Sequence, residues 1–343
     1  MYDLIQFTDE QQYIDMFLAL PQTVYHGDKK YSKEKPAETT AWLLGQHPST
    51  GFLKQKNLLV LRNGAPAARG IAFVNTLGNF GTIGFFDCLE DAQAVKVLAD
   101  AAKVFCKAHG MDKIYAPMNG SIFASYRLMT KGFEDKPFLS EPYNKPYYHD
   151  VLVACGFRVA KTWETQFVDI RKNANKAQLA KSPRGITVRN FEDFDEDLRI
   201  VHKLVMNSFA NFFLFHELDE ETFASMLAKV KMVYNKHTSK IAYNSAGEPV
   251  GFGLALPDYQ SIPGFLLKYA KRYVFLYLGT VQENGETVYL RAAHAIVAPI
   301  LQHLHKKRKG LICGMMSEDA KTRYFATEYD RIHEYALLAL EVD

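Results

Sequence analysis

The sequence predicts an α/β (α+β) protein of two consecutive domains, each with a mixed, mostly antiparallel twisted sheet around a parallel strand–helix–strand unit flanked by helices. The stretch 83–119 reads as a strand, an amphipathic helix and a second strand, so close together that the strands should run parallel with a right-handed crossover. The same order of elements returns roughly 180–200 residues later. A length of 343 residues also favours two domains over one.

The helix of the first unit, expected over 91–109, is the clearest element in the sequence. Glu90 and Asp91 lie at its start, where the helix dipole favours negative charge, and Gly110 follows its end as a C-cap. Apolar residues recur at helical spacing and predict one buried face. That face comprises Ala94, Leu98, Ala101, Phe105 and Ala108.

The remaining first-half elements follow from turn and capping signals. Thr8 with Gln11 forms a capping box, and Asn63-Gly64 is a strong hairpin turn. In chain order we expect a strand at 3–7, a helix after it, hairpin strands at 57–62 and 67–75, the strand–helix–strand unit, a helix opened by 142–148, and strand at 158–170.

A change in composition separates the halves. The segment 171–185 is rich in Lys, Asn, Ser and Gly, and we interpret it as the linker between domains 1–170 and 186–343. Pro299 should kink the long second-half helix. The expected second-half elements are a strand at 186–189, a helix at 195–209, hairpin strands at 240–243 and 249–256, a strand at 273–281, helices at 291–309 and 321–328, and strands at 311–316 and 332–342.

Composition narrows the class of protein. The net charge of +3 is a mild excess that does not call for nucleic acid. The four cysteines show no paired spacing, which argues against a disulfide framework or a metal cluster and suits a cytoplasmic protein. The most apolar stretch, 262–281, is interrupted by Lys268 and Lys271, so we expect no membrane span. Early acidic residues argue against a signal peptide.

The order of elements resembles the acyl-CoA N-acyltransferase fold, known as GNAT. Particular strings resemble segments of an uncharacterised bacterial group of tandem GNAT proteins. These strings are Gly84-Phe85-Phe86-Asp87-Cys88, Ala116-Pro117-Met118-Asn119, the segment 142–148, and Phe209-Ala210-Asn211 with Glu220-Glu221. The resemblance covers most of the chain and implies an acetyltransferase-like enzyme with acetyl-CoA or another acyl-CoA as co-substrate and no metal.

In GNAT enzymes a glycine-rich loop after the fourth strand holds the CoA pyrophosphate at a helix N-terminus. The first-half loop, 89–92, has no glycine and two carboxylates, so we expect no CoA phosphate there. The second-half loop, 282–288, keeps only Gly285, and Asn284-Gly285 also reads as a plain turn. If the protein is an enzyme, its acyl donor should lie in the second half, along Leu278, Gly279, Thr280 and Val281, with Arg291 as the compensating cation for the pyrophosphate.

GNAT chemistry asks little of side chains: a base deprotonates the amine, and a tyrosine often protonates the leaving thiolate. The resemblance makes Tyr324 the better candidate for general acid, with Tyr329 on the same stretch. The alternative for Tyr324 is an aromatic packing on the sheet. Glu318, with Asp319, follows a strand and is the candidate base; helix capping is the alternative.

The first half carries a second candidate pocket. Asp87 and Asn119 follow adjacent parallel strands at the sheet edge where open α/β sheets place ligands. An aromatic and amide cluster follows later in the chain and consists of Tyr143, Asn144, Tyr147 and Tyr148. Asn144 also suits a helix N-cap. The pocket is expected to hold an uncharged or amine ligand or to be filled by protein.

Three functions remain open. The first is an N-acyltransferase acting on a small amine, and the second is a catalytically silent protein that binds a metabolite or a protein partner, with a homodimer among the possibilities. The third, from architecture alone, is an aminoacyl-tRNA-dependent transferase, although nucleic acid is otherwise not expected. The basic run 306–309 fits a solvated helix end, and anion binding is its alternative reading.

Overall fold

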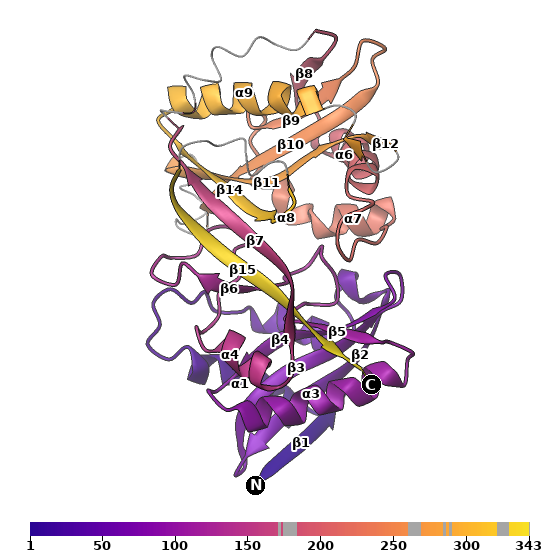
Figure 1. The fold of residues 1–343 in the computed structure, drawn as a ribbon, viewed down its shortest axis with the longest axis vertical. Coiled ribbons are helices and arrows are strands. Elements are labelled where there is room, and N and C mark those ends of the chain that lie inside the picture. The colour runs from indigo at the N-terminus through magenta and orange to yellow at the C-terminus, as the bar shows by residue number, and fades with distance from the viewer. Residues whose placement is uncertain are drawn as a thin grey trace. The chain divides into compact units, whose positions relative to one another are not determined.

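The computed structural model describes residues 1–170, 173, 184–259, 269–283, 286–287, 290–320 and 329–342. The chain forms two compact units. Unit 1 comprises Met1–Thr162 and Glu334–Asp343, and unit 2 comprises Trp163–His333. Each has a mixed sheet covered by helices, the fold class that the sequence predicts (Figure 1).

Unit 1 is built on a sheet with the order β1-β2-β3-β4-β5-β15, and β6 pairs with β15. Its strands are β1 (Tyr2–Phe7), β2 (Leu53–Arg62), β3 (Ala65–Asn75), β4 (Phe80–Cys88), β5 (Lys113–Ala116), β6 (Leu128–Lys131) and the second part of β15 (Tyr329–Glu341). Its helices are α1 (Gln11–Val24), α2 (Pro36–Leu43), η1 (Pro48–Thr50), α3 (Ala92–Lys107) and α4 (Tyr148–Ala154).

The strand–helix–strand unit predicted at 83–119 is confirmed as β4–α3–β5. β4 and β5 pair in parallel, with Gly81 opposite Ile114 and Thr82 opposite Tyr115. The hairpin turn is confirmed as well: Asn63 and Gly64 join β2 to β3 with φ of 52° and 81°. Two positive φ values are those of a type I′ turn, which Asn-Gly favours.

Helix α3 packs on β2 and β3, but its buried face is turned relative to the prediction. Ala94 and Leu98 are buried as expected, whereas Ala101 and Phe105 are only half-buried and Ala108 is exposed. The deeper positions are Val95, Ala99, Ala102 and Cys106. Small residues populate both neighbouring faces of this helix, so spacing alone did not identify the one that faces the sheet.

Unit 2 repeats the plan with the sheet order β7-β14-β11-β10-β9-β8. Its strands are the second part of β7 (Arg158–Val168), β8 (Thr187–Asn190), β9 (Ser239–Tyr243), β10 (Pro249–Pro257), β11 (Arg272–Thr280), β14 (Gly310–Ser317) and the short pair β12 (Gln282–Glu283) and β13 (Glu286–Thr287). Its helices are α6 (Phe194–Ser208), α7 (Glu220–Met226), α8 (Ala228–Lys231) and α9 (Leu290–Lys306).

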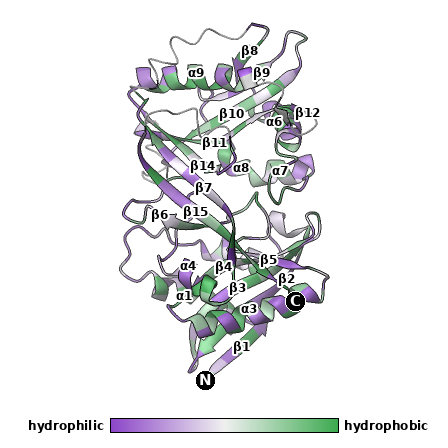
Figure 2. Cartoon of the chain, viewed as in Figure 1, coloured by the Kyte–Doolittle hydropathy of each residue, from purple (hydrophilic) through white to green (hydrophobic). Residues whose placement is uncertain are grey.

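Helix α9 joins the parallel strands β11 and β14 and packs on β10, β9 and β11 (Figure 1). Pro299 lies inside this helix, which is assigned without a break from Leu290 to Lys306. Figure 2 shows both hydrophobic and hydrophilic colours along α3 and α9, as expected of helices that bury one face.

The compact units differ from the predicted domains at two points. The residues from Trp163 onward belong to unit 2, because the end of β7 pairs with β14. Glu334–Asp343 belong to unit 1, because β15 pairs there with β5 and β6. Most of the predicted linker 171–185 and the predicted helix 321–328 lie outside the described residues.

The described part of the chain has neither a membrane-spanning helix nor a cluster of metal ligands. No helix there combines the length and hydropathy of a membrane span. No three His, Cys, Asp or Glu side chains there are grouped to hold a metal ion.

Candidate active site

Each unit has a pair of parallel strands that leads to the edge where open α/β sheets bind ligands. In unit 1 the gap between β4 and β5 is closed by the chain itself. Beyond the two paired residues, the Met118 N–H donates to the Ile83 carbonyl at 2.8 Å. The Asn119 side-chain oxygen accepts from the Phe85 N–H, also at 2.8 Å. Phe85 has a φ of 48° and lies where the register between β3 and β4 shifts. Asn119 therefore accepts the hydrogen bond from the backbone N–H that this bulge leaves without a strand partner.

The N-terminus of α3 is also occupied. The Asp91 carboxylate accepts from the Ala94 N–H at 3.1 Å and from the Tyr2 hydroxyl at 3.0 Å. The Arg62 guanidinium lies 2.8 Å from the same carboxylate. An internal carboxylate thus sits where a helix would otherwise attract a phosphate, and its charge is already neutralised. This geometry supports the expectation that the 89–92 loop binds no CoA phosphate.

Asp87 is the centre of a buried polar network. Its Oδ2 accepts from Arg69 Nε at 2.9 Å, and its Oδ1 accepts from the Tyr148 hydroxyl at 2.8 Å and the Tyr25 hydroxyl at 3.1 Å. Arg69 is completely buried. Arg69 also donates to Glu34 at 2.5 Å and to a backbone carbonyl of α1 at 3.0 Å. Each of the three nitrogens of this buried guanidinium donates to at least one acceptor, and a buried charge needs such partners.

The network carries two carboxylates on one guanidinium. Burial raises the pKa of Asp87 above its ordinary value, Arg69 opposes the shift, and the charge of Glu34 adds to it. Tyr25 and Tyr148 have raised pKa values, first because they are buried and then because they face the Asp87 charge. Both hydroxyls therefore remain protonated donors to Asp87.

Aromatic rings from the segment after α1 cover this network. Tyr25 and Tyr31 stack with ring centroids 3.9 Å apart and planes 3° from parallel. The Tyr143 hydroxyl and the Lys145 ammonium both donate to the Asp28 carboxylate, at 2.9 and 3.0 Å. The predicted pocket around Asp87 is thus occupied by side chains of the protein.

The structure brings together some of the predicted first-half residues and separates others. Tyr147 joins the cluster, because its hydroxyl donates to the Cys88 carbonyl at 2.8 Å. Asn144 is buried and brackets Met129, accepting from its N–H at 2.7 Å and donating to its carbonyl at 3.2 Å. The suggested N-cap role of Asn144 is wrong, since α4 begins only at Tyr148. Asn119 lies apart from these residues in its bonding, because its side chain contacts the β4 bulge.

Unit 2 has a different arrangement at the corresponding strands. β11 and β14 pair in parallel over four residue pairs that end at Phe275 and Cys313. Beyond them, β11 continues along β10, with a register shift at Leu254/Ala255 that leaves one extra residue, Leu276, on β11. β14, which pairs with β7 from Leu311 onward, continues along β7, with Met316 opposite Glu164. The two parallel strands therefore part at their carboxyl ends, within the described residues.

The predicted donor residues follow this point on β11. Leu278 and Val281 are half-buried, and Gly279 and Thr280 are buried. A Cβ on Gly279 would lie 2.5 Å from the Phe252 ring and 3.1 Å from Ser208 Cβ, so glycine is required by close packing. The Ser208 hydroxyl is buried without a hydrogen-bond partner among the described residues.

The connection from β11 to α9 is a small hairpin rather than a long loop. β12 pairs with β13, with Glu283 opposite Glu286. Asn207 at the end of α6 anchors its start: the Asn207 side chain accepts from the Gln282 N–H at 2.8 Å and donates to the Gln282 carbonyl at 3.3 Å. Arg291 is exposed in the first turn of α9. Residues 284–285 and 288–289 lie outside the described residues.

The predicted catalytic residues lie at or beyond the end of β14. Glu318 is exposed directly after the strand, and Ser317 donates a hydrogen bond to Asp319. Tyr329 is exposed at the start of β15. Tyr324 lies outside the described residues, so its role stays a prediction. Glu318 follows β14, and the predicted donor site lies on β11, the parallel partner of β14. Glu318 and the donor site therefore lie at the same edge of the sheet.

Sequence reasoning missed Arg69, Tyr25 and Glu34, three residues that complete the Asp87 network. One signal was present: Arg69 is a lone charge within the apolar run 67–74 of a predicted strand. A charge in such a run indicates a buried partner. Tyr25 and Glu34 lie in a stretch without periodicity, and nothing local marked them.

No family model matches the sequence. A curated relative, protein YghO of Escherichia coli (strain K12), is 24% identical over 254 residues, which are 71% of this chain and 65% of that protein. The chain thus spans less than two thirds of that relative's length.

Two solved structures share the fold. A tandem GNAT protein from the clavulanic acid biosynthesis pathway has a TM-score of 0.58 at 10% identity, covering 100% of this chain and 99% of its own. A GCN5-related N-acetyltransferase from Sphaerobacter thermophilus has a TM-score of 0.52 at 13% identity, covering 99% and 96%. At such identities the likeness concerns the fold, and the chain has the predicted tandem GNAT fold.

Proposed function

We propose that the protein is an acyl-CoA-dependent N-acyltransferase that acts on a small amine, with its single donor site in unit 2. The parting of β11 and β14 after Phe275 and Cys313 carries this proposal. Among the described residues, this leaves one edge of β11 without a strand partner at the carboxyl end of the sheet, where an extended ligand can pair with main-chain groups. In unit 1, the corresponding gap is closed by Met118 and Asn119.

The donor would lie along Leu278–Val281. A pantetheine arm carries amide groups that can bond to a strand edge as another strand does, and such pairing is insensitive to side-chain identity. Its pyrophosphate would meet Arg291 and the first turn of α9 rather than a glycine-rich loop. The unpartnered Ser208 hydroxyl, packed against Gly279, offers one further polar group beside that arm.

The reaction itself needs two proton transfers. The amine nitrogen attacks the thioester carbonyl carbon, the new C–N bond forms, and the C–S bond breaks. Glu318 is the candidate base that takes the amine proton, directly or through water, and Tyr324 is the candidate acid that protonates the CoA thiolate. Exposure of Glu318 at the end of β14 gives it access to solvent and to an incoming amine.

The alternative is a silent tandem GNAT protein that binds a metabolite or a partner without acyl transfer. It is favoured by one observation: the phosphate loop expected after β11 is replaced by the β12–β13 hairpin, whose sequence contains Glu283 and Glu286. Carboxylates in that connection oppose a pyrophosphate.

Calorimetric titration of the full chain with acetyl-CoA separates the two functions. We expect saturable binding that Arg291→Ala weakens by about 1–2 kcal/mol, the scale of a lost charge-assisted hydrogen bond. Arg62→Ala is the matched control, because Arg62 lies at the equivalent helix start in unit 1 and should leave binding unchanged. If Arg62→Ala weakens binding and Arg291→Ala does not, the donor binds in unit 1, and the proposed site in unit 2 is wrong.

Turnover of an acyl-CoA with a panel of small amines then tests the chemistry. Tyr324→Phe should lower kcat and leave donor affinity nearly unchanged, because a general acid acts only in the reaction step. If wild type neither binds nor consumes any acyl-CoA, the silent-binder function takes the place of the transferase.

A further inference from the structure

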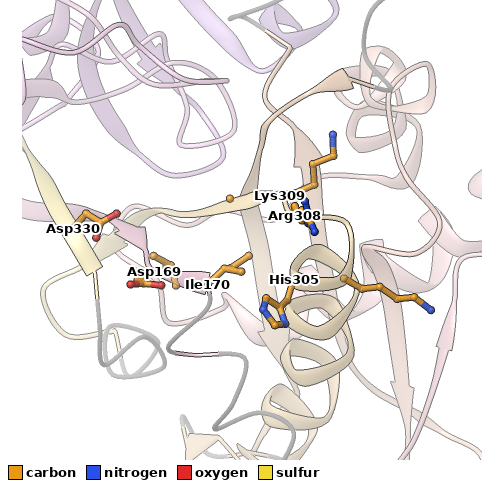
Figure 3. Close-up of a pocket in the computed structure, with 9 residues that line it drawn as sticks. Asp169, Ile170, His305, Arg308, Lys309 and Asp330 are labelled. Carbon is orange, nitrogen blue, oxygen red and sulfur yellow. The ribbon is translucent and has the colours of Figure 1, made fainter.

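A hollow of about 770 Å³ lies in unit 2 where α9 ends and β14 begins. Its volume falls within the range of small-molecule sites. Figure 3 shows Asp169 and Asp330 on one side and His305, Arg308 and Lys309 on the other. Lys306 also lines the hollow, and Val168, Ile170 and Gly310 complete the described lining.

The hollow is remote from the proposed acyl-donor site. It lies at the C-terminal end of α9, whereas Arg291 lies in the first turn. α9 has seventeen residues, so its two ends lie roughly 24 Å apart at the usual rise per residue. A ligand here would be a second ligand, and its binding does not depend on the proposed reaction.

Within the described residues, the cations of the hollow form no salt bridge. Lys306, Arg308 and Lys309 take part in none of the salt bridges of the described residues, which in unit 2 join Arg189 to Asp197, Arg199 to Glu220, Lys231 to Asp195 and Arg272 to Asp258. They also stand beside further positive charge. His303 stacks on His237 at 4.8 Å, and its pKa is lowered first by burial and then by repulsion from His237, Lys307, Lys240 and Lys306.

The backbone of Arg308 gives an independent indication. Its φ is 54°, in the left-handed region that normally takes glycine when a helix ends. The turn is well formed: the Arg308 N–H donates to the His305 carbonyl and the Lys309 N–H to the Leu304 carbonyl, each at 2.9 Å. An arginine is less favourable than glycine at this backbone conformation. A side chain kept at a strained position points to a role beyond folding.

We propose that this hollow binds a phosphate-bearing small molecule, whose phosphate groups contact Lys306, Arg308 and Lys309. Phosphate is the anion that clustered Lys and Arg side chains recognise best, Arg through its planar fork and Lys as a point charge. The Asp330 carboxylate repels anions on its side of the hollow, so the anionic end of a ligand should face the Lys and Arg side chains.

The test is a calorimetric titration of the full chain with inorganic pyrophosphate at low ionic strength. Wild type should bind pyrophosphate with a Kd below about 1 mM, and ATP at least as well if the natural ligand is a nucleotide. Vesicles containing anionic phospholipid form a separate arm, because a lipid headgroup carries the same phosphate chemistry. Failure of wild type to bind pyrophosphate or ATP by about 1 mM, with or without vesicle binding, overturns the proposal.

Three variants give the site its signature. Arg308→Gly should weaken pyrophosphate binding about fivefold or more while leaving the thermal midpoint unchanged or higher, because glycine suits the backbone. Asp330→Asn should tighten binding by removing a repelling charge. Lys307→Gln, the matched control in the same run but outside the lining, should change affinity less than about twofold.

Two results would contradict the site. Equal weakening by Arg308→Gly and Lys307→Gln would mean diffuse attraction rather than a built site. Weakening by Arg291→Ala would mean that pyrophosphate enters the proposed donor site. The proposed acyltransferase survives either result, because acetyl-CoA binding is measured separately.

Discussion

The β4–α3–β5 crossing of unit 1 and the β11–α9–β14 crossing of unit 2 share a topology but differ in what fills their ends. In unit 1, Asp91 caps the helix, Asn119 takes the Phe85 N–H, and Asp87 is enclosed by protein. In unit 2, the strands part after Phe275, and Arg291 stands exposed at the helix start. In unit 1 the chain's own groups fill this edge, whereas in unit 2 the described parts of the two strands separate there, which is the basis of the proposed donor site.

The largest test of this contrast concerns the buried guanidinium of unit 1. Arg69→Met leaves Asp87 buried without its counter-charge and should lower the free energy of unfolding by about 3–5 kcal/mol. Urea denaturation measures the loss. Arg62→Met is the control, because the Arg62 side chain is 47% exposed and its pair should contribute about 1 kcal/mol or less. Equal costs for the two variants would deny that the network holds unit 1 closed.

A smaller effect is expected where the amide of Asn119 closes the β4 bulge. Asn119→Ala removes the acceptor of the Phe85 N–H and should cost about 1–2 kcal/mol. Hydrogen exchange at the Phe85 amide should become faster. Asn119→Asp retains an acceptor oxygen and should restore much of the protection; exchange that ignores both changes would mean the bulge is closed by other contacts.

The cap of α3 should contribute less again. Asp91→Ala should lower the free energy of unfolding by about 1 kcal/mol, the usual value of an N-cap. Asp100→Ala, which breaks an exposed pair with Lys96 on the same helix, should cost only about 0.3–0.5 kcal/mol. Because Asn119 still closes the strands, Asp91→Ala should gain no acetyl-CoA binding. A gain would show that one carboxylate alone separates the two crossings.

The smallest expected effect is a difference in response to acid. The folded-state pKa of His303 lies below its ordinary value, so its contribution to stability is present above about pH 6.5 and is lost as the pH falls through the folded pKa. The raised pKa of Asp87 has the opposite sign: its contribution is present below its ordinary value and is lost as the pH rises through the folded pKa.

NMR titration of His303 and urea denaturation at several pH values would measure this difference. His303→Gln should flatten the loss of stability on mild acidification, whereas Asp87→Asn should not. If the His303 imidazole titrates at or above its ordinary pKa, the positive field inferred around the end of α9 is contradicted.

Local signals predicted the elements, and long-range pairing decided what they do. The Asn63-Gly64 turn and the capped helix after Asp91 are specified by residues close together in the sequence, so the sequence predicted them. Two members of the Asp87 network were not found, because Tyr25, which bonds to Asp87, and Glu34, which bonds to Arg69, lie in a distant segment without periodicity. The same reason hid the closure by Asn119, whose residue type was noted but whose acceptor role depends on the bulge at Phe85.

The candidate site in unit 2 was predicted only in outline. The sequence indicated Leu278–Val281 from the position of the central strand, and the structure adds the parting of the strands and the hidden hydroxyl of Ser208. Neither follows from spacing, because the first depends on which strands flank β11 and β14, and the second depends on the packing of α6 against Gly279.

The placement of β15 has a consequence for how the protein is made. Its residues Glu334–Ala336 pair with β6 and Leu338–Glu341 pair with β5, both in unit 1, although a ribosome adds them more than 200 residues after those strands. The sheet of the first unit therefore lacks a strand while the second unit is synthesised. During that interval the edge of β5 is available for non-native strand pairing. A fragment that stops at residue 170 would lack this strand, so its behaviour in solution would report on an incomplete sheet rather than on a domain.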